Sequence, residues 1–466
     1  MVMQSINPAT EEVLGTFDEF SPDQVDRALQ LAHDAQRRWR ETSFGERAAG
    51  LQRVARILRT QKTRWANLAT EEMGKPIIEA EAEVDKCAWN CDFYAEHAAR
   101  FLGDEHVETN AAESFVAFEP LGVVLAIMPW NFPFWQVIRF AAPALMAGNA
   151  AVLKHASNVP RCALALEEIF TAAGLPEGLF RTVLIPGGQV EALIADPRIQ
   201  AVTLTGSSEV GERVASAAGR NLKKQVLELG GSDPFVVLAD ADVQAAATTA
   251  VRARNQNNGQ SCIAAKRFIV EEPLADEFTE KFAAAVKALH VGDPMQRETN
   301  VGPLARGDLR ETVASQVERS LSSGAHALVG GAPLDGRGYF YAPTVLDGVK
   351  LDMPAFREEV FGPVAAVIRA RDADDAVRLA NDTEYGLGAA LWSRDTERAK
   401  ALARRIEAGN VFINGMVASD PRLPFGGVKR SGYGRELSSF GIREFTNIQT
   451  IWVGQPTAPA QRGAAE

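Results

Sequence analysis

The sequence is poor in cysteine, and this scarcity limits the chemistry available to the protein. Only four cysteines occur in 466 residues, without the spacing of a disulfide framework, so we expect a reducing compartment. Cys87 and Cys91 are one helical turn apart, but no second Cys/His pair near them completes a zinc site. The N-terminus lacks a basic segment followed by an apolar one, and no run of 18 apolar residues occurs. We therefore expect a cytoplasmic protein that is not embedded in a membrane.

Positive charge is also scarce. Lys and Arg number 49 against 60 Asp and Glu, which gives a net charge of −11. This balance argues against nucleic acid or an anionic membrane as a main partner. The fractions of hydrophobic and charged residues, 46% and 23%, are ordinary for a globular protein. Because 466 residues exceed what one hydrophobic core holds, we expect two or three domains.

The first half of the chain changes from helical to alternating patterns. Ser21 and Pro22 are typical of a helix start, and apolar residues recur at helical spacing up to residue 102. From residue 121, short apolar runs alternate with helical stretches; the runs lie at 123–127, 150–153, 180–185 and 201–204. This order predicts right-handed βαβ units and a parallel, doubly wound sheet, which binds ligands at the carboxyl ends of its strands.

A second α/β block begins near residue 231. Its predicted strands are 235–238, 267–270, 364–368, 389–392 and 410–413. Segments 114–118 and 447–453 also have strand character, and we expect them to extend a sheet across a subunit interface. The predicted domains are a dinucleotide-binding domain (1–101 and 121–229), a catalytic domain (230–440) and β oligomerisation strands (102–120 and 441–456). Residues 457–466 are predicted to be disordered.

Three polar residues are candidates for catalysis. Cys262 ends a polar, glycine-containing turn between a predicted helix and strand, which suits a nucleophile, although a buried hydrophobic role is the alternative. Glu228, flanked by leucines and followed by two glycines, is either structural or a base with a raised pKa. Asn131 lies in a loop stiffened by two prolines, where its amide is either an oxyanion donor or a loop cap.

A possible phosphate site follows one of the predicted strands. Residues 205–211, Thr-Gly-Ser-Ser-Glu-Val-Gly, join a strand to a helix, so backbone N–H groups at the helix start could meet a phosphate. The Gly-x-Gly-x-x-Gly fingerprint is absent, so a variant motif would be needed. Lys154, at the end of another strand, adds a cation where a ribose or phosphate would lie; a solvated lysine is the alternative.

Seven motifs over nearly the whole chain resemble NAD(P)-dependent aldehyde dehydrogenases in content and order. They are Pro-Trp-Asn-Phe-Pro (129–133), Gly-Leu-Pro-Glu-Gly (174–178), Thr-Gly-Ser (205–207), Leu-Glu-Leu-Gly-Gly (227–231), Gly-Gln-Ser-Cys (259–262), Glu-Glu-Val-Phe-Gly-Pro (358–363) and Pro-Phe-Gly-Gly-Val-Lys-x-Ser-Gly-x-Gly (424–434). The resemblance implies two α/β domains with a β oligomerisation arm, assembled as a homodimer or homotetramer.

The same resemblance implies a mechanism. Cys262 would attack the aldehyde, Asn131 and the Cys262 N–H would hold the oxyanion, hydride transfer to the nicotinamide would leave a thioester, and Glu228 would activate the hydrolytic water. This scheme requires no metal. An amide or nitrile hydrolase could use the same nucleophile and base, but it would not need the Thr-Gly-Ser motif or Lys154.

The chain resembles the succinate-semialdehyde branch of this family. The resemblance implies that Arg139 and Ser419 receive the distal carboxylate of the substrate. Gln256 stands where part of the branch has a second arginine, so we expect weaker or broader carboxylate binding, with glutarate semialdehyde or a broad range of aldehydes as alternative substrates. The full predicted substrate set is Arg139, Trp135, Gln256, Ser261 and Ser419.

The stretch Lys154-His155-Ala156-Ser157 bears on the choice of cofactor. Relatives that prefer NAD resemble it but have a glutamate at the fourth position, and Ser157 removes that negative charge. We therefore expect NADP to be preferred and NAD tolerated. The predicted cofactor-binding residues are Trp130, Lys154, Ser157, Gly206, Ser207, Gly211, Leu229, Glu359 and Phe361.

Overall fold

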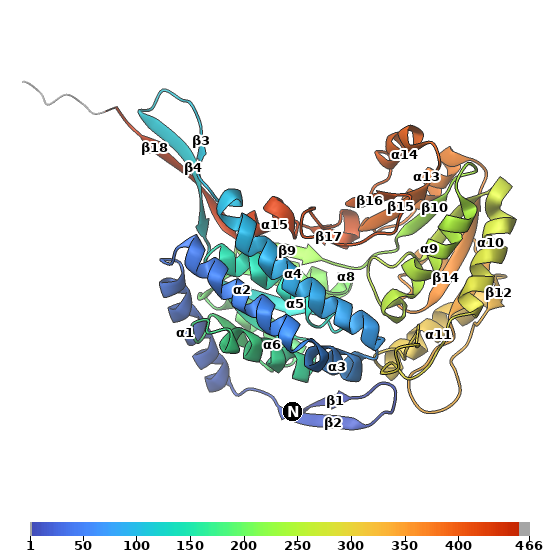
Figure 1. Cartoon of the computed structure of the whole chain (residues 1–466), viewed down its shortest axis with the longest axis horizontal. Coiled ribbons are helices and arrows are strands. Elements are labelled where there is room, and N and C mark those ends of the chain that lie inside the picture. Colours follow the sequence, from blue (N-terminus) through green and yellow to red (C-terminus); the bar gives the residue numbers. More distant parts are fainter. Residues whose placement is uncertain (1, 456–466) are drawn as a thin grey trace, which may run out of the picture.

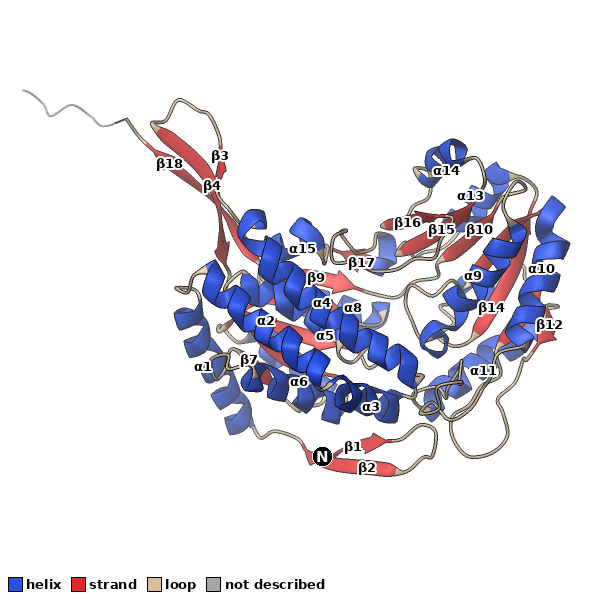
Figure 2. Cartoon of the chain, in the orientation of Figure 1, coloured by secondary structure: helices blue, strands red, loops and turns tan. Residues whose placement is uncertain are grey.

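The computed structural model describes residues 2–455 and shows two α/β lobes and a projecting β arm (Figures 1 and 2). The first lobe holds a six-stranded sheet in the order β17-β9-β8-β5-β6-β7, parallel except for β17. Its strands are β5 (Val123–Met128), β6 (Ala150–His155), β7 (Phe180–Thr182), β8 (Ile199–Thr205), β9 (Lys224–Glu228) and β17 (Gly432–Tyr433). The doubly wound parallel sheet predicted from the sequence is confirmed.

Helices surround this sheet. They are α1 (Pro22–Trp39), α2 (Phe44–Thr60), α3 (Lys62–Met73), α4 (Ile77–Phe101), α5 (Trp135–Met146), α6 (Pro160–Ala172), α7 (Val190–Ala195) and α8 (Ser208–Arg220). The predicted start of α1 is confirmed, because Ser21 and Gln24 each accept a hydrogen bond from the other's backbone N–H, forming a capping box. No helix within residues 2–455 is both long and apolar enough to cross a membrane.

The second lobe contains a seven-stranded sheet in the order β12-β13-β14-β11-β10-β15-β16, in which only β12 runs antiparallel to its neighbour. Its strands are β10 (Pro234–Val237), β11 (Arg267–Glu271), β12 (His326–Val329), β13 (Thr344–Asp347), β14 (Val364–Ala370), β15 (Gly388–Trp392) and β16 (Asn410–Ile413). Its helices are α9 (Val243–Asn255), α10 (Glu272–Lys287), α11 (Gly307–Ser322), α12 (Pro354–Arg357), α13 (Ala373–Asn381) and α14 (Thr396–Ala403).

Some elements differ from the sequence pattern. The pattern does not indicate β9, because charged or polar residues flank its apolar pair Val226 and Leu227. It does not indicate α11 either. The predicted strand 180–185 ends at Thr182. The missed strand matters for function, since Glu228 is its last residue.

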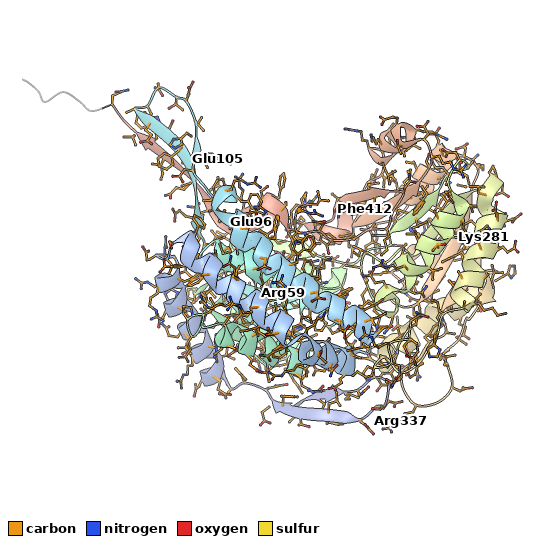
Figure 3. All side chains as sticks on the ribbon, in the orientation of Figure 1. Arg59, Glu96, Glu105, Lys281, Arg337 and Phe412 are labelled. Carbon is orange, nitrogen blue, oxygen red and sulfur yellow. The ribbon has the colours of Figure 1, made fainter. Side chains whose placement is uncertain are left out.

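The arm is a three-stranded sheet that projects away from both lobes (Figure 1). It comprises β3 (Glu105–His106), β4 (Glu113–Pro120) and β18 (Thr446–Val453), with β18 antiparallel to β4 along their full lengths. Trp452 on β18 is exposed. Glu105 of β3 lies on the arm, and Phe412 lies half-buried on β16, one of the two edge strands of the second lobe (Figure 3). The oligomerisation role of the arm stays a prediction, and the predicted disordered tail (457–466) lies outside the described residues.

Candidate active site

The nucleophile candidate lies on a strained loop. Between α9 and β11, the short helical turn η2 (Gln256–Gly259) contains Asn257 and Asn258 at φ 57° and 59°, a left-handed conformation that asparagine tolerates better than most residues. Gly259 follows at φ 72°, and a Cβ there would lie 2.4 Å from the carbonyl of Gly362. The asparagines thus favour the sharp turn just before Cys262, and the glycine is required by the close approach of Gly362.

Buried amide side chains fasten the same loop. Asn257 Nδ2 donates to the backbone carbonyls of Asn131 and Gln260, both at 2.9 Å, and Asn258 Nδ2 donates to Gly74 O at 2.8 Å. These bonds tie the nucleophile loop to the first lobe. Both asparagines were missed as functional residues, although an Asn-Asn-Gly run is a recognisable signal for left-handed backbone.

Lys266 contacts the backbone around the nucleophile Cys262. Its Nζ donates to the carbonyls of Cys262 at 2.7 Å, Ser261 at 2.9 Å and Ala264 at 3.1 Å. Cys262 itself is half-buried; burial raises the pKa of its thiol to about 12, while the cations Lys266 and Arg139 act in the opposite direction. The resting group is therefore a thiol that must lose its proton to react. Lys266 was also missed by the sequence reasoning.

Asn131 is buried beside this loop. Its Nδ2 donates to Gln260 O at 3.1 Å, which leaves the second hydrogen of the amide uncommitted. His155 holds the end of the loop 129–133 at Pro133. Its Nδ1 accepts a hydrogen bond from Ala156 N, so its Nε2 carries the hydrogen and donates to Pro133 O; both distances are 2.9 Å. Burial lowers the pKa of His155 to about 4, so this ring is neutral at neutral pH. These hydrogen bonds hold the loop 129–133 in place, and the Asn131 amide keeps one N–H as an available donor.

Glu228 ends β9 with its carboxylate in the interior. Neither of its oxygens has a hydrogen-bond partner within residues 2–455. Burial raises its pKa well above the usual value; the neighbouring Glu436 raises it further, and Arg139 lowers it. A Cβ on Gly426 would lie 2.8 Å from Glu228 Oε1, so the glycine of the Pro-Phe-Gly-Gly motif makes room for the carboxylate. A buried carboxylate without partners is suited to taking up a proton.

A cavity of about 360 Å³ opens on Cys262. All five predicted substrate residues line it: Arg139, Trp135, Gln256, Ser261 and Ser419. Four charged residues that the sequence reasoning missed line it as well: Glu79, Glu83, Lys86 and Arg252. The first three lie on α4 at helical spacing, but only the docking of α4 against α5 shows that this face meets the cavity. Glu228 and Asn131 are not among the lining residues.

Arg139 is already engaged in this structure. Its guanidinium is paired with the carboxylate of Glu436, and the two side chains are 2% and 4% exposed. It also donates to Thr205 Oγ1 at 3.3 Å and lies 4.9 Å from the centre of the Phe425 ring. The predicted contact between Arg139 and a substrate carboxylate stays a prediction, and any such contact would have to share the guanidinium with Glu436.

Lys154 and Ser157 line a separate cavity of about 530 Å³ at the end of β6. Arg306 and Asp308 lie at the same cavity and are paired with each other by two bonds of 2.9 Å. Lys154 has no hydrogen-bond or ion-pair partner within the described chain, and burial lowers its pKa. An unpaired, partly buried cation beside a serine suits an anionic group such as a phosphate.

The predicted phosphate loop caps a helix. Ser207 Oγ accepts from Val210 N at the start of the 13-residue helix α8, and Gly206 N donates to Glu228 O at 3.0 Å. A Cβ on Gly211 would lie 2.5 Å from Leu229 Cδ1, so this glycine lets α8 pack closely against the end of β9. The cofactor roles of these four predicted residues stay predictions.

Glu359 and Phe361 come from the second lobe and meet the first lobe beside the nucleophile. Glu359 Oε1 accepts from Gly231 N at 3.0 Å and lies 3.7 Å from Lys266 Nζ. Phe361 packs edge-on against Trp130, with ring centres 5.8 Å apart. A Cβ on Gly231 would lie 2.7 Å from Cys262 O. The predicted cofactor residues Trp130, Glu359 and Phe361 are thus gathered around the catalytic loop.

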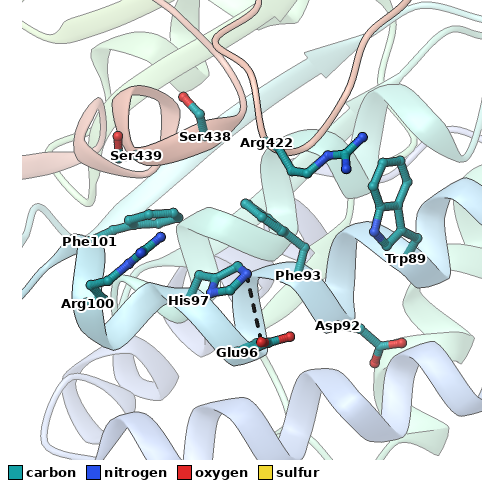
Figure 4. A pocket seen from close by; sticks show the side chains of 10 residues that line it. All are labelled: Trp89, Asp92, Phe93, Glu96, His97, Arg100, Phe101, Arg422, Ser438 and Ser439. Atoms are coloured by element: carbon teal, nitrogen blue, oxygen red, sulfur yellow. Dashed lines mark ion pairs between the residues drawn. The ribbon is translucent and has the colours of Figure 1, made fainter.

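A larger cavity, of about 610 Å³, lies further along α4, beside the C-terminal half of the helix (Figure 4). Phe93, His97 and Phe101 of α4 border it, together with Ser438 of the short helix α15 (Ser438–Arg443). Its His97 and Glu96 are 4.0 Å apart. It contains none of the predicted site residues, so size alone does not identify the active site.

Comparison with known proteins agrees with this geometry. Residues 1–451 match the aldehyde dehydrogenase family. The chain is 53% identical to a probable succinate-semialdehyde dehydrogenase [NADP(+)] of Synechocystis, over 97% of this chain and 100% of that protein. It is 51% identical to succinate-semialdehyde dehydrogenase [NADP(+)] 1 of Mycobacterium tuberculosis, with the same coverage. The crystal structure of succinic semialdehyde dehydrogenase from Streptococcus pyogenes with NADP+ superposes with a TM-score of 0.95 at 41% identity, over 97% of this chain and 100% of that one. The chain belongs to the aldehyde dehydrogenase family.

Proposed function

We propose that this protein oxidises succinate semialdehyde to succinate with NADP+ as the preferred cofactor and NAD+ tolerated. The observation that carries the proposal is the positive charge of the cavity over the half-buried Cys262. The cations Lys86 and Arg252 line this cavity, together with Arg139, which is paired with Glu436. The names of the relatives from Synechocystis and Mycobacterium tuberculosis support the same substrate and cofactor.

The two carboxylates of this cavity do not cancel its positive charge. Glu83 is paired with Lys75 and accepts from two backbone N–H groups at 2.8 Å each. Glu79 accepts from Asn257 N at 2.6 Å, and burial raises its pKa to about 7, so it is partly protonated at neutral pH. A small aldehyde with a carboxylate at its far end would therefore find a complementary surface.

The residues of the second cavity fit an NADP cofactor better than an NAD cofactor. Lys154 offers an unpaired ammonium beside Ser157, where a 2′-phosphate would be attracted and where position 157 itself carries no glutamate to repel it. Trp130 and Phe361, packed edge-on near the nucleophile loop, would border the nicotinamide end. When bound, the cofactor supplies the acceptor for the hydride that leaves the substrate carbon.

The protein's own groups would act in sequence around that transfer. Cys262 loses its proton to solvent and its sulfur bonds to the aldehyde carbon, giving a thiohemiacetal oxyanion near the free N–H of Asn131. Oxidation of this carbon leaves a thioester on Cys262. Glu228 then removes a proton from water, and hydroxide addition releases the acid and regenerates the thiolate. Burial raises the pKa of Glu228, which makes its ionised carboxylate a stronger base than that of an exposed glutamate.

Steady-state kinetics test this proposal. Purified protein is assayed with succinate semialdehyde, glutarate semialdehyde and butyraldehyde, each with NADP+ and NAD+, by following the reduced cofactor. We expect the highest kcat/KM with succinate semialdehyde and NADP+, and no activity for Cys262→Ala despite intact cofactor binding. A higher kcat/KM for glutarate semialdehyde would change the substrate, and equal values for charged and uncharged aldehydes would indicate a broad-specificity enzyme. Amide or nitrile hydrolysis without cofactor reduction would overturn the oxidoreductase assignment.

A further inference from the structure

Lys86 differs from the other cations of the catalytic cavity. It projects from α4 into the cavity, where its Nζ donates to Ser419 Oγ at 2.7 Å and lies 4.4 Å from the centre of the Trp135 ring. No carboxylate lies within 4 Å of it in the described part of the chain. An ammonium has three donors, so two of them are unused by the protein.

The other two cations are less available. Arg139 is already paired with Glu436, so its charge is largely neutralised. Arg252 is exposed, and water solvates it. Lys86 is partly buried and has no ion-pair partner, and burial together with the nearby Arg139 lowers its pKa to about 8. Binding of a carboxylate lowers the free energy most at a cation that is partly desolvated and has no ion-pair partner.

We propose that Lys86 and Ser419 together bind the distal carboxylate of the aldehyde substrate and so determine specificity, an inference that rests on the proposed function. Ser419 Oγ accepts its hydrogen bond from Lys86, which leaves the hydroxyl hydrogen free to donate to one carboxylate oxygen. Lys86 binds the other oxygen, and the Trp135 face packs against the methylene groups between carboxylate and aldehyde.

The proposed role of Lys86 also explains how this cavity can contain the neutral residue Gln256. Gln256 lines the same cavity as Lys86 but comes from the second lobe, whereas Lys86 comes from the first. This chain resembles the succinate-semialdehyde branch, part of which has an arginine at the position of Gln256. Here the side chain is a neutral amide. Lys86 supplies the positive charge from the opposite wall, so the cavity keeps its selectivity for a carboxylate without that arginine.

The test is a change in substrate preference. In Lys86→Met, we expect the ratio of kcat/KM for succinate semialdehyde to that for butyraldehyde to fall by about 10- to 100-fold, mainly through KM, as expected when a charge-assisted bond is lost. The matched control is Lys62→Met, an α3 lysine paired with Asp85 on the surface, which should leave the ratio unchanged. An unchanged ratio in Lys86→Met would overturn the inference. A wild-type protein that does not prefer succinate semialdehyde would instead overturn the proposed function.

A second measurement tests the role of Lys86 if Lys86→Met fails to fold. Succinate is used as a competitive inhibitor, and its Ki is measured from pH 6.5 to about 9.5 for the wild type and for Lys86→Arg. Because the pKa of Lys86 is about 8, wild-type Ki should rise above that pH more steeply than the Ki of Lys86→Arg, whose arginine stays charged; ionisation of Glu79, with a pKa of about 7, contributes equally to both proteins. The titratable and charged groups facing Lys86 are Glu83 and Cys87 on α4, Arg139 on α5 and Asp420 from the loop that follows β16. Parallel pH profiles for the two proteins would overturn the inference.

Discussion

Replacing Arg139 by methionine should affect stability and general catalysis more than substrate choice. The Arg139–Glu436 pair is almost completely buried, and removing one member of a buried ion pair typically costs about 3–5 kcal/mol, because the other charge is left uncompensated. The double variant Arg139→Met/Glu436→Gln should recover most of this loss, since no charge is then left unpaired.

The loss should also grow with pH. Without Arg139, the carboxyl groups of Glu436 and Glu228 lose a favourable charge, so their pKa values, already raised by burial, rise further. A carboxyl whose pKa is raised in the folded state is most favourable when protonated, and its contribution to stability is lost as the pH increases through that pKa. The stability gap between wild type and Arg139→Met should therefore be smaller at pH 6 than at pH 8.5.

Urea denaturation at the two pH values, with tryptophan fluorescence as the probe, measures the effect on stability. Kinetics with succinate semialdehyde and butyraldehyde measure the effect on catalysis, and we expect similar losses for the two substrates. The reasoning is refuted if Arg139→Met unfolds at the wild-type urea midpoint and loses activity with the semialdehyde alone. In that event Arg139 itself would be the carboxylate receptor, and the role assigned to Lys86 would be wrong.

Three further substitutions probe the remaining roles. Glu228→Gln should release one equivalent of reduced cofactor in a burst and then stall at the thioester; absence of the burst would mean that Glu228 acts before hydride transfer. Asn131→Ala should lower kcat by about 10²–10³ if its amide holds the oxyanion, whereas a change confined to KM would assign it to substrate positioning. Ser157→Glu should shift the kcat/KM ratio towards NAD+, because the new carboxylate would pair with Lys154 and repel a 2′-phosphate; an unmoved ratio would contradict this reading.

The sequence predicts the main architecture because its signals are local. The Ser21-Pro22 start of α1 depends on hydrogen bonds within one turn, and the alternation of apolar runs and helices identifies the parallel sheet without any distant contact. Strand β9 is missed because its two-residue apolar core is too short to show a period. Such an element is defined by its neighbours β8 and β17, which no local pattern shows.

The sequence predicts those parts of the candidate site that belong to recognisable motifs. It misses the parts that form only when helices pack together. All five predicted substrate residues line one cavity with Cys262. Lys86 was missed because a lysine on an amphipathic helix is usually solvated, and only the docking of α4 turns it inward. The Arg139–Glu436 pair joins residues almost 300 positions apart, and sequence alone offers no means of matching them.

The placement of β17 and β18 has a consequence for biosynthesis. The first lobe receives its edge strand β17 from residues 432–433, and β4 of the arm receives its partner β18 from residues 446–453. Roughly 200 residues separate Glu228 from these segments, so at about 5–20 residues per second a ribosome needs roughly 10–40 s to deliver them. During this interval the first lobe would carry an open sheet edge at β9, and Glu228 would lack its surrounding loop. The nascent protein therefore has a period of exposure to chaperones and proteases that ends only when β17 pairs with β9 and β18 pairs with β4.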